Sequence, residues 1–205
     1  MKIIVATENE HKMHEIREIL AGSGADLFSL HDLGIKAEAE ETGRIFAENA
    51  EIKAREIYKK ILKKTGEPAL VLADDSGLCI DALNGAPGVY SARFMGHDTP
   101  YTEKNTALLE QLKDVPDEKR GAQFVCDICA ILPNGTALHA VGVMPGQIAH
   151  EIAGVNGFGY DPIFYLPEYG KTSAELSEEE KNRISHRGNA LRTMRELLES
   201  AGVLA

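Results

Sequence analysis

The stretch "ALVLADDSGLCID", Ala69–Asp81, decides the fold, because an apolar run leads directly into two adjacent aspartates. Five small or apolar residues predict a buried strand that ends where Asp74 and Asp75 begin. Ligands commonly bind beyond the carboxyl ends of strands in open α/β sheets. Adjacent side chains of an extended chain point to opposite faces, so at most one aspartate faces a given site. We expect the other to brace the turn that follows the strand.

Strand-type and helix-type segments alternate around this stretch, which predicts an α/β fold with a mixed sheet. Apolar runs predict strands at residues 2–6, 69–73, 122–132 and 136–144, and a short one within 162–167. The pair Asn134-Gly135 predicts a hairpin between the third and fourth of them. Apolar spacing of three to four predicts helices at residues 8–22, 46–64, 101–112 and 185–199. Residues 83–94 are expected to be rich in turns and then extended.

The composition limits the partners of the chain. A net charge of −10 repels nucleic acid polymers and anionic membranes, but it permits a small anion where cations or a metal gather. Because no apolar run approaches ~20 residues and the first residues lack signal-peptide features, we expect a cytoplasmic protein without a membrane span. Cys126 and Cys129 lie three apart in a predicted strand, so their side chains face opposite sides and are expected to be buried thiols.

Two segments near predicted helix starts could bind phosphate and metal. Residues 7–12, "TENEHK", end a strand and open a helix, where backbone N–H groups, Thr7, Asn9 and Lys12 could hold an anion. The alternative is plain helix capping by Asn9 with a solvated Lys12. Residues 40–43, "EETG", could supply a carboxylate to Mg²⁺, or could serve only the dipole of the next helix.

Two later segments could bind the rest of a nucleotide. In "GFGYDP", residues 157–162, glycines flank an aromatic ring, so Phe158 or Tyr160 could stack on a base while Asp161 orients a donor. The alternative is an ordinary glycine loop with aromatic core residues. Residues 181–188, "KNRISHRG", gather cations in an acidic chain and could bind phosphates or base oxygens, or could be a solvated helix start.

Taken together and in order, these segments resemble the inosine triphosphate pyrophosphatase family, and within it the bacterial dITP/XTP pyrophosphatases. The resemblance covers nearly the whole length of the chain. It rests on the segments "VATENEHK", "EETGRIFAENAEIKA", "LADDSGLCIDALNGAPGVYSARF", "GFGYDPIF" and "EKNRISHRGNAL". The departures, a lysine-rich "YKKILKKTGEP" and Val-Asn in "GVNGFGYD", touch no motif.

The resemblance implies a fold, a reaction and a set of site residues. The fold would be one pyrophosphatase domain over residues 1–205, an elongated mixed sheet flanked by helices, with two lobes around a deep nucleotide-binding cleft. The chain would be a homodimer that hydrolyses ITP, dITP and XTP to the monophosphate and pyrophosphate with Mg²⁺. Asp75 would be the catalytic residue and, with Glu41, a metal ligand. The substrate-binding residues would be Thr7, Glu8, Asn9, Glu10, His11, Lys12, Ser76, Phe158, Gly159, Tyr160, Asp161, Lys181, His186 and Arg187.

Physical chemistry adds detail to these expectations. A triphosphate needs cations, so Lys12 and Lys181 are expected near the phosphates and the leaving group. Metal-assisted activation of water is favoured over proton abstraction by Asp75 alone, because a carboxylate beside Mg²⁺ is a weak base. Discrimination against adenine requires a donor toward the purine O6. We expect Arg187 or nearby backbone N–H groups to supply it while Phe158 stacks on the ring.

Two rival functions remain open on the sequence. One is a pyrophosphatase for modified pyrimidine triphosphates. The other is a nucleotide-binding sensor without turnover, although such a sensor would have no need for Asp75, Glu41 and Lys12 together.

Overall fold

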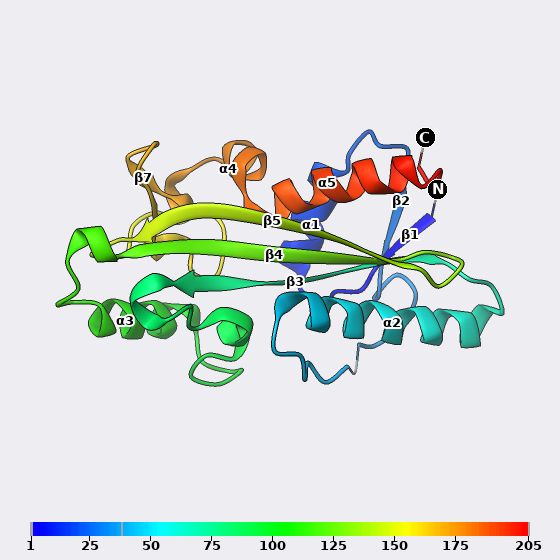
Figure 1. Cartoon of the computed structure of the whole chain (residues 1–205), viewed down its shortest axis with the longest axis horizontal. Helices are drawn as coiled ribbons and strands as arrows, with labels where there is room; N and C mark the ends of the chain where they lie inside the picture. The colour runs from blue at the N-terminus through cyan, green and yellow to red at the C-terminus, as the bar shows by residue number, and fades with distance from the viewer. Residues whose placement is uncertain (1, 38, 205) are drawn as a thin grey trace. The chain divides into compact units, whose positions relative to one another are not determined.

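The computed structural model describes residues 2–37 and 39–204 and contains one mixed sheet. Seven strands follow the order β2-β1-β3-β4-β5-β6-β7 (Figure 1). β1 pairs in parallel with β2 and β3, whereas β6 is antiparallel to β5 and β7. The strands are β1 Lys2–Val5, β2 Asp26–Ser29, β3 Leu70–Ile80, β4 Gly121–Ile131, β5 Ala137–Ile148, β6 Phe164–Leu166 and β7 Lys171–Thr172. The predicted α/β fold with a mixed sheet is therefore confirmed.

The helices include several ends with clear capping chemistry. They are α1 Glu10–Ile19, α2 Phe46–Thr65, α3 Tyr101–Gln111, α4 Glu178–Ile184 and α5 His186–Ser200. The Oδ1 atom of Asn9 accepts the backbone N–H of Lys12 at 3.1 Å and caps α1. Gly66 ends α2 with a φ of 76°, a left-handed conformation that glycine adopts without strain. Ser177 and Glu180 form a capping box that opens α4.

The chain divides into two compact units, which are described separately. Unit 1 comprises residues 1–75, 126–142 and 187–205, and unit 2 comprises residues 76–125 and 143–186. The single domain with a cleft between two lobes, expected from the resemblance, stays a prediction.

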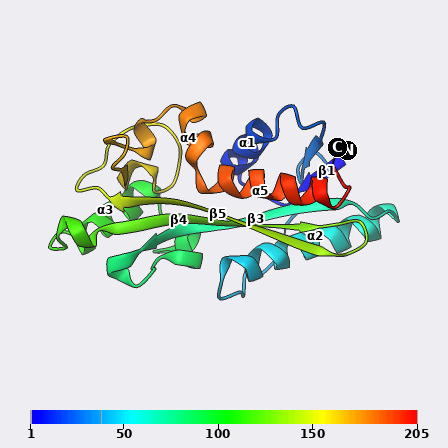
Figure 2. The ribbon, with the colours of Figure 1, turned by 45° about the horizontal axis from the view of Figure 1, so that its top comes forward.

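Unit 1 buries apolar side chains on both faces of its strands. One cluster joins α1 and α5 to strand residues such as Val5 and Cys126, and a second joins α2 to residues such as Val71 and Cys129. Figure 2 shows α1 and α5 on one side of these strands and α2 on the other. The two cysteines are free, buried and on opposite faces, as their spacing predicts.

Unit 2 has a core cluster to which α3 contributes Leu108 and the residue that caps its C-terminus, Leu112. This cluster also contains Tyr160, which places the aromatic-glycine segment of residues 157–161 against the core of the unit.

Within the described part of the chain, residues 2–37 and 39–204, no helix combines the length and the apolar character that a bilayer span requires.

The prediction that a strand ends before the acidic pair is wrong. β3 continues from Leu70 to Ile80, so Asp74 and Asp75 lie within the strand and Asp74 braces no turn. Cations on both faces compensate the carboxylates, so the strand does not have to end there. Residues 83–94 also differ from expectation, because a 3-10 helix η2, Gly88–Arg93, replaces the extended segment. The strand β2 and the short helix α4 were not predicted.

Candidate active site

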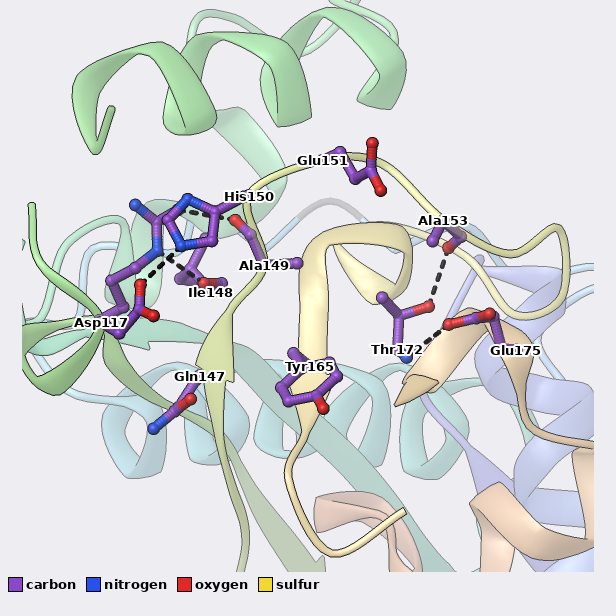
Figure 3. A pocket seen from close by; sticks show the side chains of 11 residues that line it. Asp117, Gln147, Ile148, Ala149, His150, Glu151, Ala153, Tyr165, Thr172 and Glu175 are labelled. Carbon is purple, nitrogen blue, oxygen red and sulfur yellow. Dashed lines mark hydrogen bonds and ion pairs between the residues drawn. The ribbon is translucent and has the colours of Figure 1, made fainter. Parts of the chain in front are cut away.

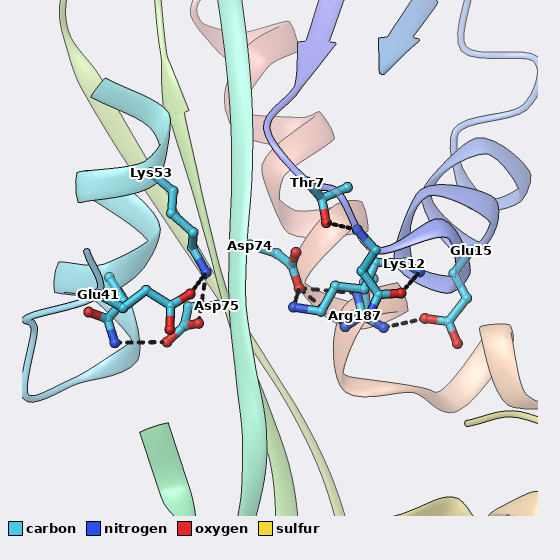
Figure 4. Close-up of polar contacts among 10 residues, drawn as sticks. Thr7, Lys12, Glu15, Glu41, Lys53, Asp74, Asp75 and Arg187 are labelled. Carbon is cyan, nitrogen blue, oxygen red and sulfur yellow. Dashed lines mark hydrogen bonds and ion pairs between the residues drawn. The ribbon is translucent and has the colours of Figure 1, made fainter. Parts of the chain in front are cut away.

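The two aspartates of β3 point to opposite faces of the strand and bind different cations (Figure 4). The Oδ2 atom of Asp74 lies 2.9 Å from the Nζ atom of Lys12 and 3.1 Å from the Nη2 atom of Arg187. On the other face, the Oδ1 atom of Asp75 lies 2.8 Å from the Nζ atom of Lys53. The predicted alternation is confirmed, and the two carboxylates occupy separate environments within unit 1.

Asp74 is held as a permanently ionised anchor. Burial opposes its charge, but Lys12 and Arg187 outweigh burial and hold the pKa of this carboxyl far below its usual value. Arg187 is itself buried at the start of α5 and also binds the carboxylate of Glu15 through Nη1. Asp74 therefore ties the starts of α1 and α5 to β3, and it is too weak a base to accept a proton.

Asp75 has the opposite character. Burial raises the pKa of the Asp75 carboxyl, and the attraction of Lys53 offsets this only in part. The same ammonium of Lys53 lies 3.0 Å from the Oε1 atom of Glu41, so two carboxylates converge on one cation. Asp75 is consequently the more basic member of the acidic pair. The carboxylate of Glu41 lies beside it, on the same ammonium of Lys53.

A short hydrogen-bonded chain connects Asp75 to the segment that carries Glu41. The buried amide of Asn49 in α2 donates to the Oδ2 atom of Asp75 at 3.2 Å and accepts the backbone N–H of Gly43 at 2.8 Å. Gly43 has no room for a side chain, because an added Cβ would lie 2.6 Å from the Oδ1 atom of Asn49. This close approach fixes residues 41–43 beside the catalytic candidate.

Residues 7–12, the segment predicted to bind an anion, form the N-terminus of α1 and the turn before it. Asn9 caps α1, its own N–H donates to Thr7 Oγ1 at 3.2 Å, and the carboxylate of Glu8 accepts the N–H of Ala37 at 3.0 Å. Glu10 and His11 are exposed. The capping alternative is correct for Asn9, but Lys12 is engaged with Asp74 rather than free in solvent.

The predicted base-binding segment lies in unit 2 and is held by a buried ion pair. The Oδ2 atom of Asp161 accepts the N–H of Phe158 at 2.8 Å and the Nζ atom of Lys181 at 2.7 Å. Its Oδ1 atom accepts the hydroxyl of Ser173 at 2.6 Å. The ammonium of Lys181 also lies 4.9 Å from the centroid of the Phe158 ring. Lys181 thus supports the aromatic segment, and its expected contact with phosphate stays a prediction.

The other predicted residues of unit 2 lie on separate elements. Ser76 lies on β3 and is half-buried. The buried ring of His186 stacks on Phe124 at 4.8 Å between centroids. Gly159 and Tyr160 belong to the aromatic-glycine segment, and the Tyr160 hydroxyl donates to the carbonyl of Ser91 at 2.8 Å.

Sequence reasoning missed three residues around the acidic pair: Lys53, Asn49 and Glu15. A signal for each is visible in retrospect, because Asn49 and Glu15 are polar residues on the apolar faces of α2 and α1. Polar side chains at such positions need buried partners. Lys53 follows Asn49 by one helical turn and therefore shares its direction.

Unit 2 has a cavity of about 390 Å³, and none of the predicted site residues lines it (Figure 3). Several of its polar side chains are bound to one another or to the backbone. Thr172 Oγ1 donates to the carbonyl of Ala153 at 2.8 Å, and His150 Nε2 lies 2.6 Å from Asp117 Oδ1. This cavity gives no reason to move the candidate site away from the acidic pair.

Comparison with known proteins identifies the family of the chain. The family described as the Ham1 family matches residues 3–197. The chain belongs to the Ham1 family. A Ham1 relative from Yersinia pestis, named dITP/XTP pyrophosphatase, is 50% identical over 202 residues, with 98% of this chain and 99% of the relative covered. A relative of the same name from Clostridium perfringens (strain 13 / Type A) is 46% identical over 198 residues, with 97% of each chain covered.

Solved Ham1 structures agree with the fold. The structure of a HAM1 protein from Coxiella burnetii has a TM-score of 0.85 and 42% identity, with 98% of this chain and 99% of that chain covered. The resemblance expected from the sequence is confirmed.

Proposed function

We propose that this Ham1 protein is a nucleotide pyrophosphatase that hydrolyses ITP, dITP and XTP to the monophosphate and pyrophosphate. This reaction removes deaminated purines from nucleotide pools. The relatives named dITP/XTP pyrophosphatase match nearly the full length of the chain, which supports the substrate class. The reaction belongs to the hydrolases and cleaves the bond between the α and β phosphates.

The observation that carries this proposal is the asymmetry of the acidic pair. Asp74 is neutralised by Lys12 and Arg187, whereas Asp75 and Glu41 converge on the ammonium of Lys53. The two carboxylates outnumber this ammonium, so the group as a whole attracts a further cation, such as one that the substrate brings with it. Only one carboxylate of the pair is available for chemistry, and it is Asp75.

The donor set beside Asp75 fits Mg²⁺. This ion prefers carboxylate oxygens and is usually bound through one or two carboxylates together with substrate phosphates. Asp75 and Glu41 would hold it. When bound, the ion supplies positive charge that neutralises phosphate oxygens and acidifies a neighbouring water.

The residues of the chain then have distinct roles. Asp75 would hold the ion that acidifies the attacking water, and its carboxylate accepts the released proton, whereas Asp74 is bound to Lys12 and Arg187 on the other face of β3. The start of α1 and Lys12 receive the phosphates, because the helix N-terminus and the ammonium are both positive. Phe158 stacks on the purine, held by Asp161 and Lys181.

Selectivity for a 6-oxo purine remains assigned to Arg187 or neighbouring backbone N–H groups. Arg187 is also committed to Asp74 and Glu15. Replacing Arg187 would remove a cation that two buried carboxylates share, so a variant at this position would report on stability as much as on selectivity.

The direct test is pyrophosphate release across a nucleotide panel. We expect release from dITP, ITP and XTP to exceed release from ATP, UTP and TTP. Removal of divalent metal with EDTA should abolish it, and added Mg²⁺ should restore it. A preference for UTP or TTP would favour the pyrimidine alternative. Nucleotide binding without any release, with and without Mg²⁺, would favour a sensor.

Gly43→Ala is expected to weaken the metal site without removing a ligand. The added methyl must displace Asn49 or residues 41–43, so the carboxylate of Glu41 moves relative to Asp75. The Mg²⁺ concentration for half-maximal activity should rise roughly tenfold or more, as for lost supporting contacts around metal ligands. Gly135→Ala in the β4–β5 hairpin introduces a methyl at a positive-φ glycine elsewhere in unit 1 and serves as the matched control. An unchanged Mg²⁺ dependence in Gly43→Ala would contradict this role.

The homodimer is proposed on the family resemblance, and the cytoplasmic location stays a prediction from the sequence. Light scattering coupled to size exclusion would give the mass of the particle in solution. The acidic net charge of −10 supports the absence of a nucleic acid polymer or an anionic membrane as partner.

A further inference from the structure

Helix α3 buries two adjacent polar residues, Lys104 and Asn105, on the face that also carries Leu108. Lys104 is 1% exposed and Asn105 is 2% exposed. Neither belongs to the motifs that define the proposed site. Buried polar side chains are retained where their hydrogen bonds are needed, so the partners of these two residues indicate what α3 positions.

Lys104 and Tyr101 fix α3 against η2. The ammonium of Lys104 donates to the carbonyl of Ala92 at 2.7 Å and lies 4.9 Å from the centroid of the Tyr101 ring. Within residues 2–37 and 39–204, Lys104 forms no ion pair with a carboxylate. The neighbouring carbonyl of Ser91 accepts the Tyr160 hydroxyl, so η2 is bound from both α3 and the aromatic-glycine segment.

Asn105 binds the aromatic-glycine segment directly. Its Nδ2 atom donates to the carbonyl of Gly159 at 3.1 Å, next to Phe158 in the chain. Gly159 has a φ of 68°, a left-handed conformation that glycine adopts without strain. The ring of Tyr101, one turn earlier on α3, stands edge-on to the ring of Tyr160 at 5.2 Å. α3 therefore supports this segment through contacts that are separate from the ion pair of Asp161 and Lys181.

The amide of Asn105 is costly to keep for stability alone. Its Oδ1 atom is buried and accepts no hydrogen bond from the described residues, 2–37 and 39–204. A buried acceptor without a donor lowers stability, and an apolar side chain at this position would remove that cost. The useful part of the side chain is thus its N–H group, which holds Gly159.

We propose that Asn105 is a positioning residue for base selectivity, which fixes the backbone that presents Phe158 to the purine. This inference rests on the proposed function and deepens it. The base lies away from the reacting phosphorus, so loss of this support weakens substrate binding and leaves the chemical step unchanged. Selectivity falls for the same reason, because a purine that Phe158 no longer holds in place is misaligned with the donors that recognise its 6-oxo group.

Two variants that lack the donor test the proposal. Asn105→Leu fills the volume and removes the unpaired acceptor, whereas Asn105→Ala leaves a void, so their melting temperatures should differ. Both should nevertheless raise the KM for dITP about tenfold, with kcat within about twofold of the wild type, and lower the dITP-to-dATP preference similarly. Thr106→Ala, on the exposed face of the same helix, is the control because the hydroxyl of Thr106 donates to the carbonyl of Thr102 within α3.

Three results would overturn the proposal: an unchanged KM and preference in both variants, a fall in kcat at unchanged KM, or a KM that follows the melting temperatures. Failure of the wild-type protein to release pyrophosphate from dITP would instead overturn the proposed function. In that case, calorimetry with IMP still tests Asn105, since both variants should bind IMP about tenfold more weakly than the wild type.

Discussion

Asp75→Asn is expected to lower the kcat for pyrophosphate release from dITP at least ~100-fold and to leave the protein folded. The amide neither accepts a proton from water nor binds a divalent cation as a carboxylate does. The fold should survive because Lys53 keeps Glu41 as its partner and Asn49 still finds an acceptor in the new amide oxygen. Burial already disfavours the charge at this position, as the raised pKa of Asp75 indicates.

The measurement combines kinetics and stability. Pyrophosphate release at saturating dITP and Mg²⁺ gives kcat, and circular dichroism with a urea titration shows that the variant is folded. Nucleotide binding by calorimetry should persist. A folded variant that turns over at the wild-type rate would contradict the role of Asp75.

Asp74→Asn is expected to produce the opposite result, a loss of stability rather than a specific loss of chemistry. The substitution leaves Lys12 and Arg187 without the carboxylate that they share, and Arg187 is fully buried. Removing one partner of a buried ion pair should lower the free energy of unfolding by about 3 kcal/mol. Urea denaturation near pH 7 would measure this loss. A free energy within about 0.5 kcal/mol of the wild type would contradict the anchor role of Asp74.

The pH dependence gives a second measure of this anchor. The pKa of Asp74 in the folded protein lies far below the usual value for an aspartate, so its contribution to stability is present above about pH 4 and is lost as the pH falls further. The wild-type protein should therefore lose stability on acidification more steeply than Asp74→Asn. Asp127→Asn, which alters a buried carboxylate bound to His139 in the same unit, is a suitable control for acid effects elsewhere.

Local patterns predicted most of the elements. The apolar spacing of residues 46–64 anticipated α2, and Asn134-Gly135 anticipated the hairpin between β4 and β5. The opposite orientation of Asp74 and Asp75 followed from strand geometry alone. These features depend on residues that are close in sequence, so a single chain reveals them.

The course of β3 through the acidic pair could not be predicted in the same way. The cations that permit it lie far away in sequence, with Lys53 22 residues from Asp75 and Arg187 113 residues from Asp74. Asn49 and Glu15, polar residues on otherwise apolar helix faces, were the local sequence signal of this network. Asn105 on α3 is a signal of the same kind.

The most direct test of the central claim, that Asp75 is the chemically active member of the acidic pair, is a product analysis of dITP hydrolysis. Ion chromatography would follow dIMP, dIDP, phosphate and pyrophosphate for the wild type and for folded Asp75→Asn. The account predicts equal amounts of dIMP and pyrophosphate from the wild type and almost none from the variant. Release of dIDP and phosphate by the wild type, or undiminished pyrophosphate from the variant, would contradict it.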